Sequence, residues 1–488
     1  MTRRGWVAAP AAVAVLAVLA ASAKGLYVSP DGVFYVGTAR NWVDGLGFTP
    51  PPGVPPLEHF PPLFPFLLGR VGVDPLTAAR AVNLFCLAGI VVLVGLVVRA
   101  QTGSAPAGVV AAVLTAAAVD LLTLSGSALS EPLFILLGLG GLVALAAHVE
   151  RPRPAVLAGA SALVAAAFLT RYVGIAVVVA GVVALLWRRR WIDAGVFGAL
   201  SVAPVALWLA LAEGASDRSV VLHMFGADYL GQAARPFARW FVPWPTPPAG
   251  LLLAVAVVTA GAVLIRRTPP NLSLVVAGTR LFRRRERLPS TLSWLLAAFA
   301  GTYLALLLAN RALTDATGRL DARFLAPLHI VAILLVVPAL RRRPLPRPAV
   351  VLAGALVVGQ LVGAVVWAAG GLTDDSVRRR GYTSADLRRS AVLGIAGEPL
   401  YTNAVDAVWF VTGRTSSAIP AEKDYLTGKP NPHYADELAA MRAAGGTILY
   451  LDAVTFRRSF QPSRAELEAA LPLEVVAQDG VGTLYRIL

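Results

Sequence analysis

The stretch AVNLFCLAGIVVLVGLVVR, residues 81–99, contains no charge before its final arginine. Extended back to Leu76, it is an apolar run long enough for a transmembrane helix, which needs about 20 residues. Ten further runs of similar character lie at residues 6–26, 106–123, 130–148, 154–170, 172–187, 193–212, 249–265, 291–309, 323–340 and 349–369. We therefore predict a polytopic α-helical membrane protein with about eleven transmembrane helices.

The composition supports the same class of protein. Of 488 residues, 57% are hydrophobic and 15% are charged, whereas soluble domains carry roughly 25% charged residues. A net charge of +15 would suggest a nucleic-acid partner in a soluble protein, but here the arginines sit in short clusters at the ends of apolar runs, which is typical of cytoplasmic membrane loops. This distribution of arginines excludes a nucleic-acid partner. The single cysteine, Cys86, lies in an apolar run, so neither an intramolecular disulfide nor thiol catalysis is indicated.

The arginines also predict which loops face the cytoplasm, because positive charge is enriched on that side. If Arg3 and Arg4 lie inside and the helices alternate, the inner loops receive Arg99, Arg151, Arg153, Arg188, Arg189, Arg190, Arg266, Arg267, Arg283, Arg284, Arg285, Arg341, Arg342, Arg343 and Arg347. Three longer segments then lie outside, at residues 27–75, 213–248 and after about 370. We expect a multi-pass plasma-membrane protein with an extracytoplasmic C-terminus.

The predicted outer segments have structure of their own. Residues 31–44 predict an amphipathic helix along the membrane interface, and residues 62–73 predict a second apolar helix that is too short to span. Ala21, Ser22 and Ala23 resemble a signal-peptide cleavage site. We interpret the first helix as retained, and in either case the next segment starts outside.

The membrane part is expected to cover residues 1–372 and a small soluble α/β domain residues 373–488. Charges and turn residues return in this second part. Strands are predicted at residues 399–402, 447–452, 473–477 and 483–488, and helices at 384–393, 434–443 and 464–471.

Two acids mark the predicted outer ends of helices, where ionisable groups at membrane depth are costly and often functional. Asp31 follows Ser29 and Pro30, so it is either a capping acid or a general base for an acceptor hydroxyl, and spacing alone does not decide. Glu131 follows Ser130, which is expected to cap its helix. Alternatively, Glu131 orients an acceptor or binds a divalent cation such as Mg²⁺ or Mn²⁺. The sequence gives no further sign of a metal site.

Two arginines lie on the side where positive charge is disfavoured. Arg171, which precedes Tyr172, and Arg323 either snorkel to the outer headgroups or bind a phosphate through paired hydrogen bonds. Glu58 and His59 are interpreted first as loop polarity. Their functional alternatives are acceptor or metal binding, and for His59 a hydrogen bond to a sugar or phosphate.

These residues fall in motifs that resemble the GT-C superfamily of membrane glycosyltransferases, above all protein O-mannosyltransferases and lipid A aminoarabinose transferases. The motifs are Ser29-Pro30-Asp31-Gly32-Val33-Phe34-Tyr35, His59-Phe60-Pro61-Pro62-Leu63-Phe64-Pro65, Ser130-Glu131-Pro132-Leu133, Thr170-Arg171-Tyr172-Val173-Gly174 and Arg323-Phe324-Leu325-Ala326-Pro327. Their order covers most of residues 1–340.

The resemblance implies a polyprenyl-phosphate sugar donor, an active site on the outer membrane face and an essential acid at Asp31. Many relatives have a second acid where this chain has Gly32, which argues against a protein acceptor of the mannosyltransferase kind. In the expected mechanism Asp31 is the general base, and Arg171, Arg323 and Tyr172 bind the donor phosphate. The acceptor is a glycan, lipid or protein of the cell envelope.

Two other classes of function compete with this interpretation. A transporter or lipid flippase would show paired halves with broken helices near the midplane, and the sequence contains no internal repeat. A non-catalytic scaffold would need neither the acid at position 31 nor arginines at membrane depth.

Overall fold

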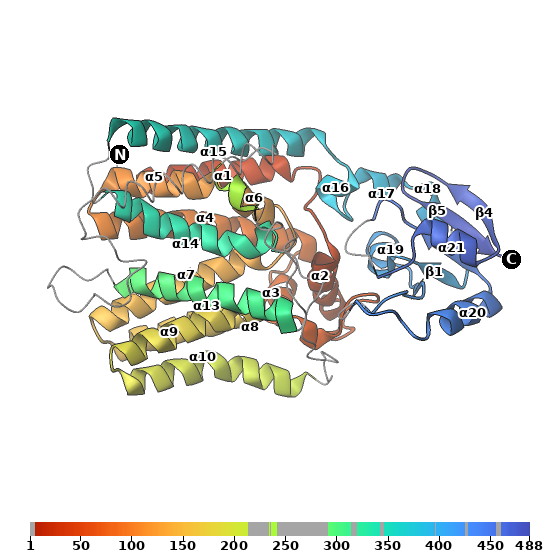
Figure 1. The fold of residues 1–488 in the computed structure, drawn as a ribbon, viewed down its shortest axis with the longest axis horizontal. Helices are drawn as coiled ribbons and strands as arrows, with labels where there is room; N and C mark the ends of the chain where they lie inside the picture. The colour runs from red at the N-terminus through yellow and green to blue at the C-terminus, as the bar shows by residue number, and fades with distance from the viewer. Residues whose placement is uncertain are drawn as a thin grey trace.

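The computed structural model describes residues 5–212, 234, 236–241, 291–313, 320–341, 346–395, 397–424, 428–454 and 460–488. Long helices lie side by side along one axis, and the C-terminal part of the chain lies at one end of this bundle (Figure 1). The bundle helices are α1 (Gly5–Ala21), α4 (Pro75–Thr102), α5 (Ala105–Ala116), α6 (Val119–Ser125), α7 (Glu131–Glu150), α8 (Pro154–Thr170), α9 (Ile175–Trp187), α10 (Trp191–Leu211), α13 (Thr291–Leu313), α14 (Ala322–Arg341) and α15 (Arg347–Thr373).

The described helices make this a multi-pass membrane protein. Six of them are long and apolar enough to cross a bilayer, and the number is seven if α5 and α6, which meet at a bend of 58°, form one span. Three further apolar helices are shorter, and together these elements overlap ten of the eleven predicted runs. The predicted run 249–265 lies outside the described residues, as does most of the predicted outer loop 213–248.

Local signals explain how the longest central helix begins and ends. The carboxylate of Asp74 accepts hydrogen bonds from the main-chain N–H groups of Leu76 and Thr77 at 3.1 and 3.2 Å, and Pro75 occupies the first turn. At the other end Gly103 adopts φ 67°, the left-handed conformation that terminates helices. These caps define a helix of 28 residues, enough to cross a bilayer.

Small residues allow the helices to pack closely, as expected where lipid replaces water as the solvent. A Cβ atom on Gly108 of α5 would lie 2.6 Å from the carbonyl oxygen of Gly95 on α4. A Cβ on Gly141 of α7 would lie 2.6 Å from a methyl group of Val164 on α8. Both helix pairs therefore depend on glycine at these crossings.

Arginines gather at the end of the bundle away from the C-terminal part. Arg190, between α9 and α10, donates to the carbonyl of Val149 near the end of α7 at 3.1 Å. Arg188 donates to the hydroxyl of Thr291 at the start of α13 at 3.3 Å. The end of α7, the α9–α10 connection and the start of α13 thus share one end of the bundle, in agreement with the predicted alternation.

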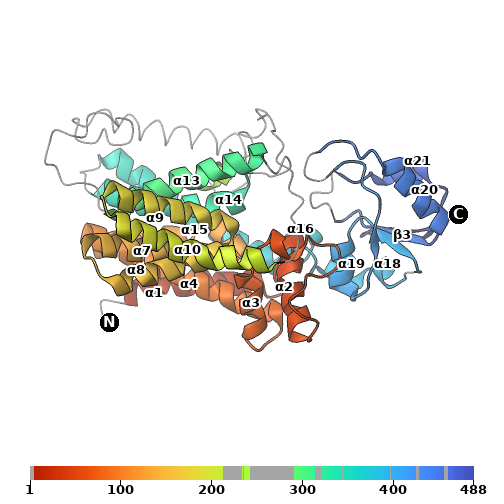
Figure 2. The same ribbon diagram turned by 90° about the horizontal axis from the view of Figure 1, so that it is seen from below.

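The opposite end carries α2 (Pro30–Val43), the one-turn helix η1 (Leu57–His59) and α3 (Leu63–Arg70). Both short helices were predicted. The prediction that the first of these helices is amphipathic and lies along the membrane interface is wrong, however. Eight consecutive residues of this helix are buried: Gly32, Val33, Phe34, Tyr35, Val36, Gly37, Thr38 and Ala39. Figure 2 shows why: α2 lies between the bundle end and α19 (Val405–Thr412) of the C-terminal part. Only the last turn, with Val43, is exposed.

The C-terminal part contains a five-stranded sheet in the order β2-β1-β3-β5-β4. Its strands are β1 (Leu400–Thr402), β2 (Ser417–Ala418), β3 (Thr447–Tyr450), β4 (Leu473–Gln478) and β5 (Thr483–Ile487). β1 pairs in parallel with β2 and β3, whereas β5 is antiparallel to β3 and β4. The helices are α16 (Val377–Arg380), α17 (Ala385–Arg389), α18 (Ala391–Gly394), α19, α20 (Tyr434–Ala444) and α21 (Arg464–Ala470). The sequence did not predict α16, α19 or β2.

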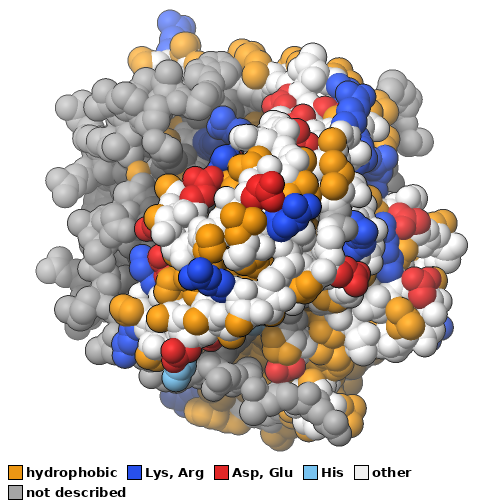
Figure 3. Space-filling view, turned by 90° about the vertical axis from the view of Figure 1, so that its right-hand side faces the viewer, with side chains coloured by type: hydrophobic (Ala, Val, Ile, Leu, Met, Phe, Trp, Pro, Cys, Tyr) orange, Lys and Arg blue, Asp and Glu red, His pale blue; other side chains and the backbone are white. Residues whose placement is uncertain are grey.

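The apolar core of the bundle continues into the C-terminal part. One cluster of buried side chains includes Phe34 of α2, Tyr382 and Val408, and it reaches Leu449 in β3. A smaller second cluster lies within the sheet region and includes Ile448 and Leu467. Figure 3 views the molecule from the end that carries the C-terminal part. Acidic and basic side chains lie next to one another on this surface, as expected of a water-exposed face.

Candidate active site

Asp31 stands at the start of α2, at the bundle end that faces the C-terminal part. Ser29 caps this helix by accepting a hydrogen bond from the N–H of Gly32 at 3.4 Å, and Pro30 occupies the first helical position. The side chain that caps α2 is therefore that of Ser29, not that of Asp31. The Asp31 carboxylate does more than favour the helix dipole, because its Oδ2 accepts a hydrogen bond from Nη2 of Arg323 at 2.7 Å.

Glu131 lies between two arginines that are remote from it in sequence. Its Oε1 contacts Nη1 of Arg171 and Nε of Arg323, each at 2.8 Å. We call Asp31, Glu131, Arg171 and Arg323 the acid–arginine cluster. It joins α2, α7, the α8–α9 connection and the start of α14. No lysine or arginine lies close to Glu131 in the sequence, but the fold brings two arginines into contact with it.

Ser130 does not cap α7 with its side chain, so that prediction is wrong. Its hydroxyl donates instead to the phenol oxygen of Tyr35 at 3.1 Å and accepts from Nη1 of Arg171 at 3.4 Å. Phe324 adds a shared aromatic face, since the guanidinium carbons of Arg171 and Arg323 lie 5.9 and 6.0 Å from its ring centre. These contacts fix both arginines in place.

Burial makes the cluster strongly interdependent. The Glu131 side chain is 1% exposed and that of Arg171 13%, against 22% for Arg323 and 30% for Asp31. A buried charge that loses its partner costs about 3–5 kcal/mol. The exposed fraction rises toward Asp31, so the cluster opens to solvent or to a substrate on that side.

The second oxygen of Glu131 is buried and has no hydrogen-bond partner among the residues that the structure describes. Buried carboxylate oxygens normally accept a hydrogen bond, because leaving one unsatisfied is costly. A hydroxyl of a bound molecule or a water would satisfy it. This oxygen is therefore a place where an acceptor hydroxyl could be held.

The other candidate residues lie beside the cluster. Tyr172 donates its hydroxyl to the carbonyl oxygen of Glu58 at 2.8 Å and accepts from Nε1 of Trp208 at 3.3 Å. Glu58 and His59 belong to η1, and the His59 ring packs edge-on against Phe60. Tyr172 and Glu58 thus connect η1 to the α8–α9 hairpin through a contact with the main chain of Glu58.

A cavity of about 550 Å³ opens on one side of Arg323. Arg239, Arg378, Arg379 and Arg380 also line it, together with the apolar side chains of Val119, Leu124, Val366 and Trp367. Tyr27 lines it as well, and burial raises the pKa of this phenol to about 12, so its hydroxyl stays protonated at neutral pH. The lining combines several cationic groups with apolar walls, and none of the described residues that line it is acidic.

Arg171, Tyr172, Glu58 and His59 do not line this cavity. Arg323 is the one member of the acid–arginine cluster that does. Sequence reasoning missed Arg239, which lies in the predicted outer segment 213–248, and also Arg378 and Arg379, because the short basic run just past α15 was interpreted only as a change of composition. The signal was present, since positive charge is unexpected next to a helix end predicted to lie outside.

The residues present do not fit a divalent cation at Glu131. The Oε1 atom that would bind the metal is already contacted by two guanidinium groups at 2.8 Å. In the part of the chain that the structure describes, no three His, Cys, Asp or Glu side chains come together. A hard cation such as Mg²⁺ needs several oxygen ligands.

Comparison with known proteins agrees with this architecture. Residues 54–219 match the family of dolichyl-phosphate-mannose-protein mannosyltransferases. No curated protein sequence matches the chain.

Solved structures are similar over nearly the whole length. ArnT from Cupriavidus metallidurans bound to undecaprenyl phosphate aligns with a TM-score of 0.59 and 15% identity, covering 99% of this chain and 98% of that one. Its apo form aligns with a TM-score of 0.50 and 16% identity, over 99% and 98%. The oligosaccharyltransferase AglB from Archaeoglobus fulgidus, in complex with an inhibitory peptide and a dolichol-phosphate, aligns with a TM-score of 0.50 and 12% identity, over 98% and 74%. The chain thus shares the fold of ArnT and AglB.

Proposed function

We propose that this protein is a glycosyltransferase that moves a sugar from a polyprenyl-phosphate donor to an extracytoplasmic acceptor, which is a glycan, lipid or protein of the cell envelope. One observation carries the proposal. Arg323 contacts both acids of the cluster, the buried Glu131 and the partly exposed Asp31, and it also lines the arginine-rich cavity. An anion held in that cavity would therefore lie next to Asp31.

The chemistry of the cavity suits a lipid phosphate. Arginine binds phosphate through paired, charge-assisted hydrogen bonds, and the apolar walls suit an isoprenoid chain. Arg323, Arg239, Arg378 and Arg379 are the proposed phosphate ligands. Undecaprenyl phosphate in ArnT and a dolichol-phosphate in AglB, as their structures are described, support the same class of donor.

Arg171 and Tyr172 stay candidates for the donor side. Arg171 also has a second role in the proposal, because it holds Glu131 from the side opposite Arg323. Glu58 and His59 stay candidates on the acceptor side, near the hairpin that carries Tyr172.

In the proposed reaction the oxygen of the acceptor hydroxyl attacks the anomeric carbon of the donor sugar. The bond between that carbon and the phosphate oxygen breaks, and Asp31 takes the hydroxyl proton. The polyprenyl phosphate leaves with the bonding electrons, and the arginines stabilise its charge. Phosphate binding would also draw the Arg323 guanidinium toward the cavity and release Oδ2 of Asp31.

Glu131 is proposed to orient the acceptor through its buried second oxygen. The Oε2 atom of Glu131 has no hydrogen-bond partner among the described residues, while the Oε1 atom of Glu131 is held by two arginines. A group held in this way positions a hydroxyl without exchanging a proton itself.

The proposal includes the finer topology. Eleven spans would divide the chain into a membrane domain of residues 1–372 and an extracytoplasmic α/β domain of residues 373–488. The acid–arginine cluster would then face the outside. The transferred sugar is a hexose or a pentose.

The test is transfer by the purified protein in lipid vesicles. We expect turnover of a synthetic polyprenyl-phosphate sugar and none of a nucleotide sugar, because no glycine-rich phosphate loop faces the cytoplasmic side in the sequence. Turnover of a nucleotide sugar without lipid carrier would overturn the donor assignment. Movement of the lipid across the vesicle membrane without transfer would favour the flippase.

A further inference from the structure

The two acids of the cluster are connected by a short ladder of main-chain hydrogen bonds. Tyr27 donates its N–H to the carbonyl of Gly126 at 3.0 Å, and Ala128 donates to the carbonyl of Tyr27 at 2.9 Å. The segment that leads into α2 therefore lies in parallel beside the segment that leads into α7.

The C-terminal part adds a third segment to this ladder. Val28 donates its N–H to the carbonyl of Arg380 at 3.1 Å, and Tyr382 donates to the carbonyl of Val28 at 3.0 Å. Residues 380–382 thus flank the segment of Tyr27 and Val28 on the side opposite Gly126.

Both acids follow this ladder at the same distance along the chain. Asp31 comes three residues after Val28, and Glu131 comes three residues after Ala128. Any shift of Val28 along the ladder would move Asp31 relative to Glu131. The register of the ladder therefore sets the spacing of the two acids.

Arg380 holds the third segment against the bundle. Its side chain is 3% exposed, and its Nη1 donates to the carbonyls of Ala21 at 2.6 Å and Gly25 at 2.9 Å. Its Nη2 donates to the carbonyl of Gly371 near the end of α15. Carbonyls at the C-terminal ends of helices are natural partners for a buried arginine, because they carry the negative end of the helix dipole.

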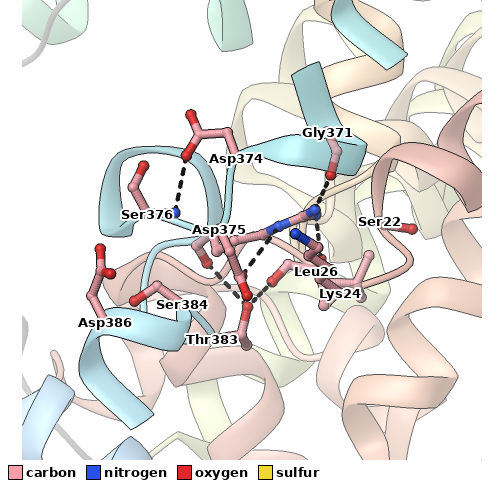
Figure 4. A network of polar contacts seen from close by, with 12 residues as sticks. Ser22, Lys24, Leu26, Gly371, Asp374, Asp375, Ser376, Thr383, Ser384 and Asp386 are labelled. Carbon is pink, nitrogen blue, oxygen red and sulfur yellow. Dashed lines mark hydrogen bonds and ion pairs between the residues drawn. The ribbon is translucent and has the colours of Figure 1, made fainter. Parts of the chain in front are cut away.

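Neighbouring contacts also hold this third segment against the bundle. Figure 4 shows Gly371, Asp375, Thr383 and Leu26 close together where the segment meets the bundle. The Thr383 hydroxyl donates to the carbonyl of Leu26 at 2.5 Å, and Asp375 lies 3.7 Å from Nε of Arg380. Both Nη atoms of Arg380 therefore donate to main-chain carbonyls of the protein, although Arg380 also lines the cavity.

Gly381 cannot be replaced in this arrangement. It adopts φ 59°, and a Cβ at this position would lie 2.0 Å from the carbonyl oxygen of Val28. Only glycine allows the two main chains to approach this closely.

We propose that Arg380 is a positioning residue for Asp31, and that the C-terminal part of the chain thereby sets the geometry of the active site. The inference rests on the proposed function for the catalytic role of Asp31. Arg380 acts through the main chain of Val28 and touches no reacting atom.

The experiment compares Arg380→Met and Arg380→Lys with Arg388→Met in the full-length protein. Arg388 is a matched control, because it lies 3.7 Å from the same Asp375 but is 49% exposed. Lysine retains the charge and part of the hydrogen bonding, whereas methionine retains only the length of the side chain.

Two measurements are combined. Hydrogen–deuterium exchange should rise about tenfold or more for the amides of Tyr27, Val28 and Ala128 in Arg380→Met. The kcat for the polyprenyl-phosphate sugar should fall about 10- to 100-fold, the effect expected of a small misplacement, while the KM for this donor stays close to wild type. Arg380→Lys should give an exchange rate and a kcat between those of Arg380→Met and wild type. Arg388→Met should match wild type in both measurements.

The outcomes separate the inference from the proposed function. A folded Arg380→Met protein with wild-type exchange at these amides, or with wild-type kcat, overturns the inference. A merely structural role would lower the amount of folded protein and leave the kcat per folded molecule unchanged, which also overturns it. If the wild-type protein transfers no sugar, the proposed function fails, while the exchange data still decide whether Arg380 holds the ladder.

Discussion

Nε of Arg323 donates to Oε1 of Glu131 at 2.8 Å although 192 positions separate the two residues in the chain. The same guanidinium donates to Oδ2 of Asp31 through a different nitrogen. One planar group thus connects two acids from two helices and lines the cavity beside them. Arginine can do this because its donors form a rigid fork, which lysine lacks.

Arg323→Lys should therefore weaken donor use strongly. The ammonium group can contact one acid or a phosphate, but it cannot reproduce the three-way geometry. We expect the KM for the polyprenyl-phosphate sugar to rise and kcat/KM to fall about 10- to 100-fold, with a smaller effect for Arg171→Lys. Steady-state kinetics in vesicles measure this. Arg341→Lys, an exposed residue at the other end of α14, is the control, and equal kinetics for Arg323→Lys and this control would contradict the phosphate assignment.

The sequence could predict the bundle but only part of the site. Apolar runs and arginine clusters sufficed for the helices, because hydrophobic length and charge act locally. The prediction that Ser130 caps α7 with its side chain was wrong because it considered only the helix that follows Ser130. Its hydroxyl instead meets Tyr35, which is far away in the chain.

The partners of Glu131 and the cavity could not be read from sequence spacing. Arg171 comes from the α8–α9 connection and Arg323 from α14, and only the packing of the bundle brings them to one carboxylate. The ladder of Val28 and Arg380 is likewise made of main-chain atoms, which leave no signature in side-chain types. Gly381 was its only local sign, as a glycine required by the close approach.

The stability of the cluster should depend on Glu131. Glu131→Ala would leave two largely buried guanidinium groups without their shared carboxylate, at a cost of about 3–5 kcal/mol. Glu131→Gln retains a hydrogen-bond acceptor and should cost less. Thermal unfolding of the purified protein in detergent measures both. Glu150→Gln, at the exposed end of α7, should leave the unfolding temperature unchanged, and an equally small change in Glu131→Ala would show that the ion pairs contribute little.

The proposed topology places positions 45 and 430 outside and position 190 inside. Single cysteines at these positions, in a background where Cys86 is replaced by serine, should show this with a membrane-impermeant thiol reagent on intact cells. Positions 45 and 430 should be labelled without permeabilisation, and position 190 only after it. Cys86 is buried, so the background substitution removes a thiol that would otherwise react only on unfolding. An internal position 430 would move the cluster to the cytoplasmic side and remove the reason for a lipid-linked donor.

Asp31→Asn separates the two roles that the sequence left open. If Asp31 only favours the dipole of α2, which Ser29 caps, asparagine should replace it at little cost, because a charge at a helix N-terminus contributes only about 0.3–1 kcal/mol. If Asp31 is the general base, the same change removes the proton acceptor and keeps the shape, which typically costs about 10²- to 10⁴-fold in rate. We expect this large fall in kcat, with normal membrane insertion and a donor KM close to wild type. Asp44→Asn, at the exposed end of the same helix, should transfer sugar at the wild-type rate. The loss should also exceed that of Glu131→Gln, since orienting a hydroxyl is less demanding than removing its proton. Wild-type transfer by Asp31→Asn would reduce this residue to a charge at the start of α2 and leave the acid–arginine cluster without a base.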